Sequence, residues 1–300
     1  MIGFVQIRRA VLAIVAVCTF TACGHGARLD SFMFTPVPVA AYVLDPRWIP
    51  ADQRELVSIT SSGPDAPAVQ ISAVFVHATN GVHGDTTVLY FHGNGDNIDH
   101  FWTRVGLLRD IGYNVLIVDY RGYGTSQGKP SEQGLYADAR AALAYLRGRP
   151  DISPAHIVLY GYSLGTAIAT NLAFEEAAQN RPFPAMILEA PFASVQALID
   201  TSAGGLGIPA SDLVDLRFDT IGKIPNIRCP LFVIHGQADN YIDWHNGLAV
   251  FNAAHDYKDH EWPLYADHGT IPRQTGAEFT PPQPDRYVQR VAEFYARFVP

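Results

Sequence analysis

Cysteine, basic residues and long apolar runs are all scarce in this sequence. Its 300 residues include 3 cysteines, and 21 Lys and Arg stand against 29 Asp and Glu, a formal net charge of −8. No basic run offers a match for the phosphate backbone of nucleic acid, so nucleic acid is not an expected partner. Hydrophobic residues make up 48% of the chain, which is enough for a large core and excludes an intrinsically disordered protein.

The N-terminus carries an apolar stretch, residues 10–20, that is shorter than the roughly 20 residues of an ordinary membrane-spanning helix. Arg8 and Arg9 precede this stretch and small residues follow it, which is typical of an export signal. Residues 1–22 are therefore predicted to be a signal peptide. An uncleaved N-terminal anchor is the alternative.

Residues 20–23 read Phe-Thr-Ala-Cys, which resembles the lipobox of bacterial lipoproteins with Phe20 in place of the usual Leu. The resemblance implies that Cys23 becomes the acylated first residue of a lipoprotein anchored to a membrane of the cell envelope. Cys18 lies in the signal, so the mature chain is left with Cys229 and no intramolecular disulfide is expected. Cys229 precedes an apolar run and is expected to be a buried structural thiol.

Prolines interrupt residues 23–55, which are predicted to form an irregular tether into one folded domain at 56–300. Residues 57–60 and 69–77 flank a Gly-Pro break and predict an antiparallel hairpin. Short apolar runs that end in glycine or polar residues then predict buried parallel strands at 88–91, 115–118, 157–160, 186–188 and 231–234.

Segments of helical periodicity separate these strands or follow them, at residues 101–111, 131–146, 164–178, 245–254 and 285–298. Because strands and helices alternate, we expect an α/β fold with a doubly wound, mostly parallel sheet and helices on both faces. Residues 194–223 leave room for a small cap at most. Its apolar side chains either line a pocket or pack on the sheet.

The sequence Gly-Tyr-Ser-Leu-Gly at 161–165 follows a predicted strand and opens a predicted helix. This is the G-x-S-x-G pattern in the strand–turn–helix context that makes it specific. Small residues on both sides let strand and helix approach closely, and the helix N-terminus directs N–H groups at an oxyanion formed there. Ser163 is therefore the candidate nucleophile.

A serine nucleophile needs a base, and the base needs an acid that orients it. The loop after the strand at 231–234 contains Asp239, and His268 follows a short strand predicted at 261–265. Ligands in such sheets bind beyond the carboxyl ends of the strands. We therefore expect Ser163, Asp239 and His268 to meet there.

Other side chains compete for the acid and base roles. Asp243 and Asp267 are rival acids, while Asp119 lies too early in the chain. The rival bases lie at other strand ends or near the preceding helix: His92, His235, His245, His255 and His260. Their positions along the chain favour Asp239 and His268 over these rivals.

Residues 86–300 resemble the α/β-hydrolase superfamily, most closely its compact alpha/beta hydrolase domain-containing serine hydrolases. Besides the candidate triad, the resemblance rests on the runs HGNG at 92–95, DYRGYGTS at 119–126, PSEQG at 130–134, EAPF at 189–192 and FDT at 218–220. It implies the α/β-hydrolase fold with a small or absent cap and the cleavage of carboxylic esters or thioesters. Asp267 stands where the family usually has glycine, and residues 269–284 form a proline-containing connection, so the substrate stays open.

In this fold two backbone N–H groups bind the oxyanion, one from the residue after the nucleophile and one from the loop after an early strand. These are expected to be the N–H groups of Leu164 and Asn94, the latter between Gly93 and Gly95.

The expected chemistry needs no cofactor and no metal, and the histidines and cysteines lack metal-ligand spacing. The expected partners are a small-molecule or lipid ester as substrate, and a membrane reached through the N-terminal lipid anchor. Three alternatives stay open: a peptidase or an acyltransferase on the same triad, and a noncatalytic binding lipoprotein with this fold.

Overall fold

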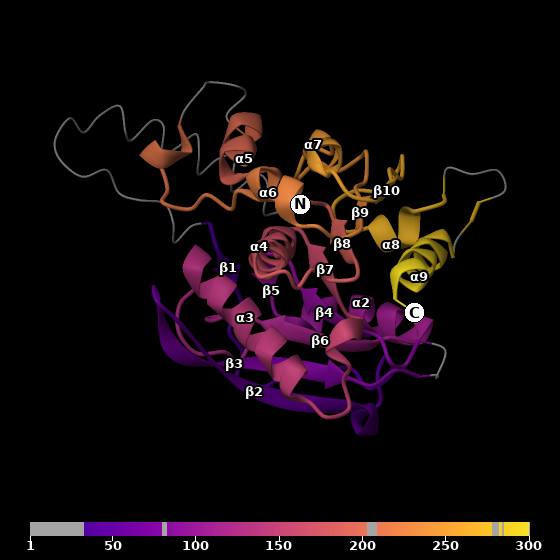
Figure 1. Cartoon of the computed structure of the whole chain (residues 1–300). Helices are drawn as coiled ribbons and strands as arrows, with labels where there is room; N and C mark the ends of the chain where they lie inside the picture. The colour runs from indigo at the N-terminus through magenta and orange to yellow at the C-terminus, as the bar shows by residue number, and fades with distance from the viewer. Residues whose placement is uncertain (1–32, 80–82, 203–208, 278–281, 284, 300) are drawn as a thin grey trace.

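An eight-stranded sheet forms the centre of the molecule in the computed structural model (Figure 1). The structure describes residues 33–79, 83–202, 209–277, 282–283 and 285–299. The predicted signal peptide and Cys23 lie outside these residues. The strand order across the sheet is β10-β9-β8-β7-β4-β6-β3-β2, and β1 and β5 form a separate two-stranded sheet.

The first two strands of the large sheet, β2 (Arg54–Gly63) and β3 (Ala66–Val76), form the predicted antiparallel hairpin. β3 also pairs antiparallel with β6. The remaining strands pair in parallel: β4 (Thr87–Phe91), β6 (Asn114–Asp119), β7 (Ile157–Tyr162), β8 (Met186–Glu189), β9 (Leu231–Ile234) and β10 (Lys258–Glu261). All but β10 are buried along their whole length, which explains why their sequences are continuously apolar and confirms the predicted parallel strands.

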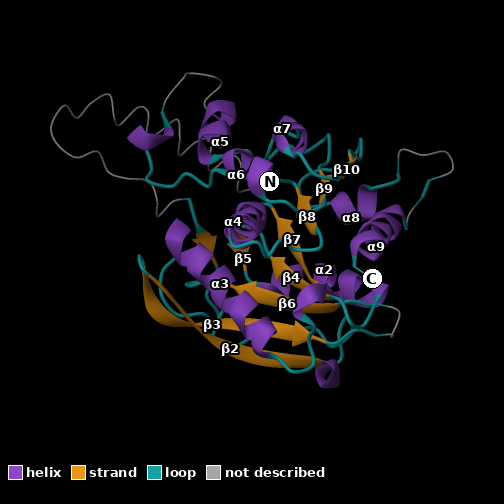
Figure 2. Ribbon diagram, in the orientation of Figure 1, coloured by secondary structure: helices purple, strands orange, loops and turns teal. Residues whose placement is uncertain are grey.

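Helices cover both faces of the sheet (Figure 2). One face packs against α3 (Glu132–Gly148), α4 (Leu164–Ala178) and α7 (His245–Ala253), and the other packs against α2 (Ile98–Ile111) and α9 (Arg286–Phe298). Successive residues of β4 alternate between the two cores, with Leu89 and Phe91 in one and Val88 and Tyr90 in the other. The predicted doubly wound α/β fold is confirmed.

Side-chain caps set where α2 and α3 begin. The Asn97 side chain accepts a hydrogen bond of 3.0 Å from the N–H of Asp99, and the Ser131 hydroxyl accepts one of 3.1 Å from the N–H of Gly134. α2 ends at Gly112, whose φ of 115° is a left-handed conformation that favours glycine.

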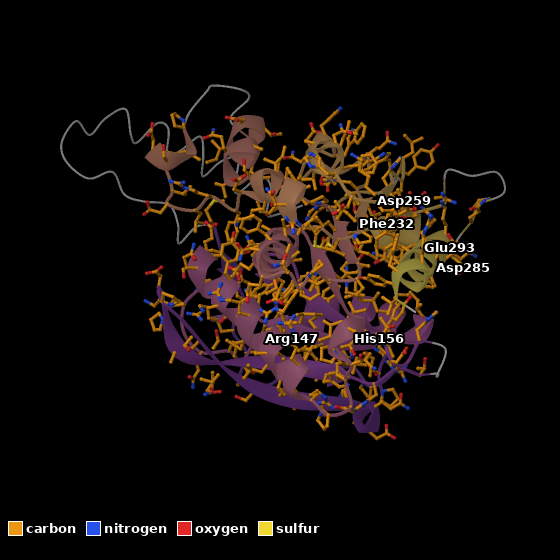
Figure 3. The ribbon with its side chains drawn as sticks, in the orientation of Figure 1. Arg147, His156, Phe232, Asp259, Asp285 and Glu293 are labelled. Carbon is orange, nitrogen blue, oxygen red and sulfur yellow. The ribbon has the colours of Figure 1, made fainter. Side chains whose placement is uncertain are left out.

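The prediction of a strand at residues 261–265 is wrong, because β10 occupies Lys258–Glu261 and the strand ends before Pro263. β10 lies at the edge of the sheet and pairs only with β9 among the described strands, so it needs no apolar run. Arg290 of α9 donates a 2.8 Å hydrogen bond to Asp259 and lies 5.0 Å from the centre of the Phe232 ring. Figure 3 shows Asp259 and Phe232 beside α9.

The described part of the predicted tether, residues 33–55, lies against the domain, and its last two residues begin β2. β1 (Thr35–Pro36) pairs in parallel with β5 (Gly95–Asp96), and the Tyr42 hydroxyl donates a 2.6 Å hydrogen bond to Asp119. Three apolar side chains of this segment are buried: Phe34, Leu44 and Ile49. Packing of the chain therefore begins before residue 56, since prolines interrupt a strand ladder without preventing burial of the side chains between them.

The cap segment, residues 194–223, holds α5 (Val195–Ser202), a 3-10 turn (Ala210–Asp212) and α6 (Thr220–Lys223), beside α4 and α7 in Figure 1. Six of its described apolar side chains are buried in the core on the α3 and α4 face: Val195, Ile199, Ala210, Val214, Leu216 and Phe218. The cap is small and is attached to the sheet by this packing.

Candidate active site

Ser163 occupies the sharp turn between β7 and α4, with φ 52° and ψ −117°. A left-handed φ is uncommon for a residue other than glycine, and such strain gathers at functional sites. The flanking glycines are required by close contacts. A Cβ added to Gly161 would lie 2.5 Å from the carbonyl oxygen of Gly165. A Cβ added to Gly165 would lie 2.0 Å from the carbonyl oxygen of Phe91.

The structure brings Ser163, His268 and Asp239 together in one chain of hydrogen bonds. His268 Nε2 lies 3.0 Å from Ser163 Oγ, and His268 Nδ1 lies 2.7 Å from Asp239 Oδ2. Because a carboxylate only accepts, Nδ1 carries the imidazole proton and Nε2 is free to accept the serine proton. Ser163 is 6% exposed and the His268 side chain 17%, so the reacting atoms lie just below the surface.

The Asp239 carboxylate is buried and fully hydrogen-bonded. Its Oδ1 accepts from the N–H groups of Tyr241 (2.8 Å) and Ile242 (2.9 Å), and its Oδ2 accepts from His268 and, at 3.2 Å, from His235. Burial by itself raises the pKa of this carboxyl. The hydrogen bonds from His235 and His268 outweigh burial and hold the pKa of Asp239 below its ordinary value.

The His268 backbone and ring are held by their neighbours. The hydroxyl of Tyr162, the residue before Ser163, donates a 3.0 Å hydrogen bond to the His268 carbonyl. The rings of Tyr162 and Tyr241 lie 5.3 and 4.9 Å from the His268 ring, centre to centre. Arg104 of α2 donates to the Gly269 carbonyl at 3.3 Å, and its guanidinium lies 4.2 Å from the Tyr162 ring centre. The turn that contains Ser163 and the loop that contains His268 are therefore fixed to each other.

The loop containing Asn94 lies beside Ser163, as expected. An added Cβ at Gly93 would be 3.4 Å from Ser163 Cβ. Leu164 is the first residue of α4, so its N–H has no partner within the helix. The structure thus places the loop that contains Asn94 next to Ser163, and Leu164 directly after it at the start of α4.

The rival acids have other partners. Asp243 bonds to the ring of His245 at 2.7 Å. Asp267 accepts from the N–H groups of Gly269 and Thr270, both at 2.9 Å, and so shapes the turn after the histidine. Asp119 is wholly buried and accepts from the Tyr42 hydroxyl.

Three residues at the site were not assigned there by the sequence: His235, Arg104 and Glu189. The sequence presents His235 only as a rival base, whereas in the structure its ring Nε2 contacts the Asp239 carboxylate. Arg104 forms an ion pair with Glu189, whose carboxylate is wholly buried at the end of β8, the strand paired with β7. Glu189 ends a buried strand, a signal that was available, whereas nothing about an arginine in an amphipathic helix marks Arg104.

Cys229 is free and buried, as predicted for a structural thiol. Burial raises the pKa of the Cys229 thiol to about 12, so the thiol stays protonated near neutral pH. Within the described residues, no three His, Cys, Asp or Glu side chains are grouped so that they could hold a metal ion. No helix in the described part of the chain is long and apolar enough to cross a membrane.

A mostly parallel sheet with helices on both faces, and a serine at a strained strand-to-helix turn, define an α/β hydrolase. A family model described as serine aminopeptidase, S33, matches residues 83–208, a range that contains Ser163 and ends before Asp239. The chain is 36% identical over 210 residues to an uncharacterized protein of Mycobacterium tuberculosis, with 69% of this chain and 67% of the relative covered. It is 33% identical over 218 residues to alpha/beta hydrolase domain-containing protein 17B of Xenopus laevis, with 70% and 66% covered.

Solved structures of similar fold include an esterase of Pyrococcus furiosus, with TM-score 0.65 and 21% identity over 89% of this chain and 98% of that one. The esterase domain of a Rhodothermus marinus protein has TM-score 0.57 and 19% identity over 83% and 100%. The chain belongs to the α/β-hydrolase superfamily, and the resemblance seen in its sequence is confirmed. It spans about two thirds of the length of the curated relatives it matches.

Proposed function

We propose that the protein is a serine hydrolase that cleaves carboxylic ester or thioester bonds through a Ser163–His268–Asp239 triad. The observation that carries the proposal is the pair of hydrogen bonds, 3.0 and 2.7 Å, that joins these side chains at the strained turn. The same constellation of nucleophile, base and orienting acid activates serine on unrelated folds, so its geometry is the specific signal.

In the proposed reaction His268 Nε2 takes the Ser163 proton while Oγ attacks the acyl carbonyl carbon. His268 then returns this proton to the alcohol or thiol leaving group, which leaves an acyl-enzyme. Water attacks the acyl-enzyme with His268 again as base, releasing the acid and restoring Ser163. Asp239 remains a carboxylate throughout and stabilises the imidazolium.

The negative oxygen of each tetrahedral intermediate would be bound by the N–H groups of Leu164 and Asn94. Leu164 is favoured because it starts a helix, whose N-terminal N–H groups lack intrahelical partners. Asn94 is favoured because its loop packs against the nucleophile turn. Removing one such donor typically lowers kcat about 10²–10³-fold.

The substrate we propose is a small-molecule or lipid ester met at the cell envelope, where the predicted Cys23 anchor would hold the protein. Esterases among the proteins of similar fold support ester chemistry. The name of the matching family model favours a second candidate, a peptidase on the same triad. Amide cleavage demands protonation of a poorer leaving group, so the two candidates differ in leaving-group preference.

Hydrolysis of three matched substrates by the purified protein separates these candidates: a p-nitrophenyl ester, an acyl thioester and an aminoacyl anilide. We expect turnover of the ester or thioester, and a loss of about 10³-fold or more in Ser163→Ala. His245→Ala, at a rival histidine that is exposed, is the control and should retain full turnover. Cleavage of the anilide alone would favour the peptidase, and equal turnover by Ser163→Ala would contradict the triad.

A further inference from the structure

His235 is a wholly buried histidine that the proposed triad does not use. It follows β9 directly and lies four residues before Asp239. Its ring Nε2 is 3.2 Å from Asp239 Oδ2 and 3.1 Å from the Ile242 carbonyl oxygen. Burying an imidazole costs free energy unless its nitrogens are hydrogen-bonded, so the contacts of this ring indicate what it does.

The contacts of the ring define its protonation. Both neighbours of Nε2 are oxygens that only accept, so Nε2 carries a proton and donates it. Nδ1 is buried and has no hydrogen-bond partner among the described residues. It lies against Gly247 of α7, where an added Cβ would come within 2.5 Å. A proton on Nδ1 would be a buried donor with no partner among the described residues, so the geometry favours the tautomer with its proton on Nε2.

We propose that His235 is a positioning residue for the triad. Its Nε2–H donates to Asp239 Oδ2, the same oxygen that accepts from His268, and so holds that oxygen in place for His268. The inference rests on the proposed function and deepens it. Oδ1 is already fixed by two backbone N–H groups, but the carboxylate can still tilt about that end. The donor from His235 removes this freedom, since Oδ2 then accepts from two rigid rings at once.

The other charged groups around the two rings are engaged elsewhere. On the His235 side, Asp243 bonds to His245. Glu261 accepts the backbone N–H of His235 with its carbonyl, and its carboxylate binds Arg286. On the side of His268, Asp267 accepts from the N–H of Thr270, and Arg104 is paired with Glu189. The neutral phenols of Tyr162 and Tyr241 flank the His268 ring.

Sharing Oδ2 has a consequence that a purely structural residue would not produce. A carboxylate oxygen that accepts a second hydrogen bond attracts the protonated form of His268 less strongly. Removing the His235 donor should therefore stabilise the imidazolium, so that a higher pH is needed to free the base. The acid limb of the kcat/KM profile should move to higher pH by about 0.5–1 unit.

The test compares His235→Gln, whose side-chain amide keeps an N–H donor near the place of Nε2, with His235→Leu, which keeps bulk and removes the donor. With the ester substrate, we expect His235→Leu to lose roughly 10–100-fold in kcat with little change in KM and to show the shifted acid limb. His235→Gln should stay within about threefold of the wild type and keep its acid limb. Thermal melts of both variants report whether the fold is intact.

Equal losses in the two variants with an unmoved acid limb would overturn the proposal and leave His235 as packing alone. A readout that needs no turnover separates this result from a failure of the proposed function. In ¹H–¹⁵N spectra of the histidine rings, we expect His235 to carry a proton on Nε2 and none on Nδ1. We also expect the Nδ1 proton resonance of His268 to shift in His235→Leu and not in His235→Gln; a doubly protonated His235 or an unmoved resonance would contradict the proposal.

Discussion

At the scale of single residues, Asp239 is the most constrained group of the site. Four donors converge on its carboxylate, two from the backbone and two from histidine rings. Burial raises its pKa, and the two histidines outweigh burial and lower it. A carboxyl whose pKa is lower in the folded state than in the unfolded chain stabilises the fold above its unfolded pKa. That stabilisation is lost as the pH falls through the folded pKa.

This linkage makes Asp239 a source of acid sensitivity. The pKa of Asp239 is lowered by folding, so its contribution is complete above about pH 5 and declines below the ordinary carboxyl value of about 3.9. We expect the free energy of unfolding of the wild type to exceed that of Asp239→Asn by about 1–3 kcal/mol at pH 7. Urea unfolding at several pH values should show this difference shrinking toward about pH 3. A constant difference, or one that grows on acidification, would contradict the assigned charge.

At the scale of elements, Arg104 joins three parts of the chain that are distant in sequence. From α2 it reaches Glu189 at the end of β8, the ring of Tyr162 in β7 and the carbonyl of Gly269 after the histidine. Glu189 also accepts from the hydroxyls of Tyr160 and Tyr287. Arg104 therefore links the residue before Ser163 to the residue after His268.

Breaking this network should cost more than breaking a surface pair. Arg104→Met leaves the buried Glu189 charge without its partner, and we expect a loss of about 3–5 kcal/mol in the free energy of unfolding. Arg140→Met, which breaks the more exposed pair between Arg140 and Glu175, should cost no more than about 1 kcal/mol. Urea unfolding of the two single variants measures these losses in the free energy of unfolding. The same measurement is made on the double variant Arg104→Met, Glu189→Gln. Equal small losses at both sites would show that the network contributes little.

The loop that contains Asn94 is hydrogen-bonded to a second element, the segment that precedes the hairpin. The Asn94 side chain donates to the Met33 carbonyl at 2.9 Å and accepts from the Thr35 N–H and the Tyr123 hydroxyl, while the Thr35 hydroxyl donates to the Asn94 carbonyl. β1 and β5 pair at the same place. The predicted tether is thus a support for the loop that carries a proposed oxyanion donor.

Asn94→Ala keeps the backbone N–H and removes the side-chain bonds that orient it. We expect kcat for the ester to fall about 10–100-fold with KM nearly unchanged. The misaligned N–H would bind the oxyanion of the transition state less well and would affect substrate binding little. Tyr42→Phe is the matched control. It loses the hydrogen bond to Asp119 farther along the same segment, and should lower Tm without lowering kcat. Steady-state kinetics and thermal melts distinguish the two, and loss of kcat in Tyr42→Phe alone would contradict this division.

At the scale of the whole molecule, most of the sheet could be predicted because its strands are buried on both faces. Residues 88–91 and 231–234 are apolar throughout and stop at polar residues, which is typical of strands buried on both faces. Ser163 could be predicted because the turn needs glycines at fixed offsets, a local constraint visible in the sequence. Chain order after later strands then pointed to Asp239 and His268.

The parts that could not be predicted depend on contacts between distant segments. β10 is polar because it lies at the edge of the sheet, and no local pattern shows which strand takes that place. The burial of Phe34 and Ile49 among prolines depends on the surface they meet. The link from His235 to Asp239 is short in sequence, but only the fold of the loop shows which ring nitrogen faces the carboxylate.

The location of the protein in the cell remains a prediction made from residues 1–23. If Cys23 is acylated, the full-length protein expressed in a bacterium should incorporate a labelled fatty acid and sediment with membranes. Cys23→Ser should abolish the label and release the protein, whereas Cys229→Ser, at the buried thiol, should change neither. Membrane association that persists in Cys23→Ser without label would favour the uncleaved N-terminal anchor.

The central claim is that Ser163 is an activated nucleophile, and covalent labelling with a fluorophosphonate tests it most directly. We expect one label per wild-type molecule, mapped to Ser163 by mass spectrometry, and loss of labelling in both Ser163→Ala and His268→Ala. His245→Ala should label like the wild type. A folded wild-type protein that takes no label, or a label that survives in Ser163→Ala, would contradict the account.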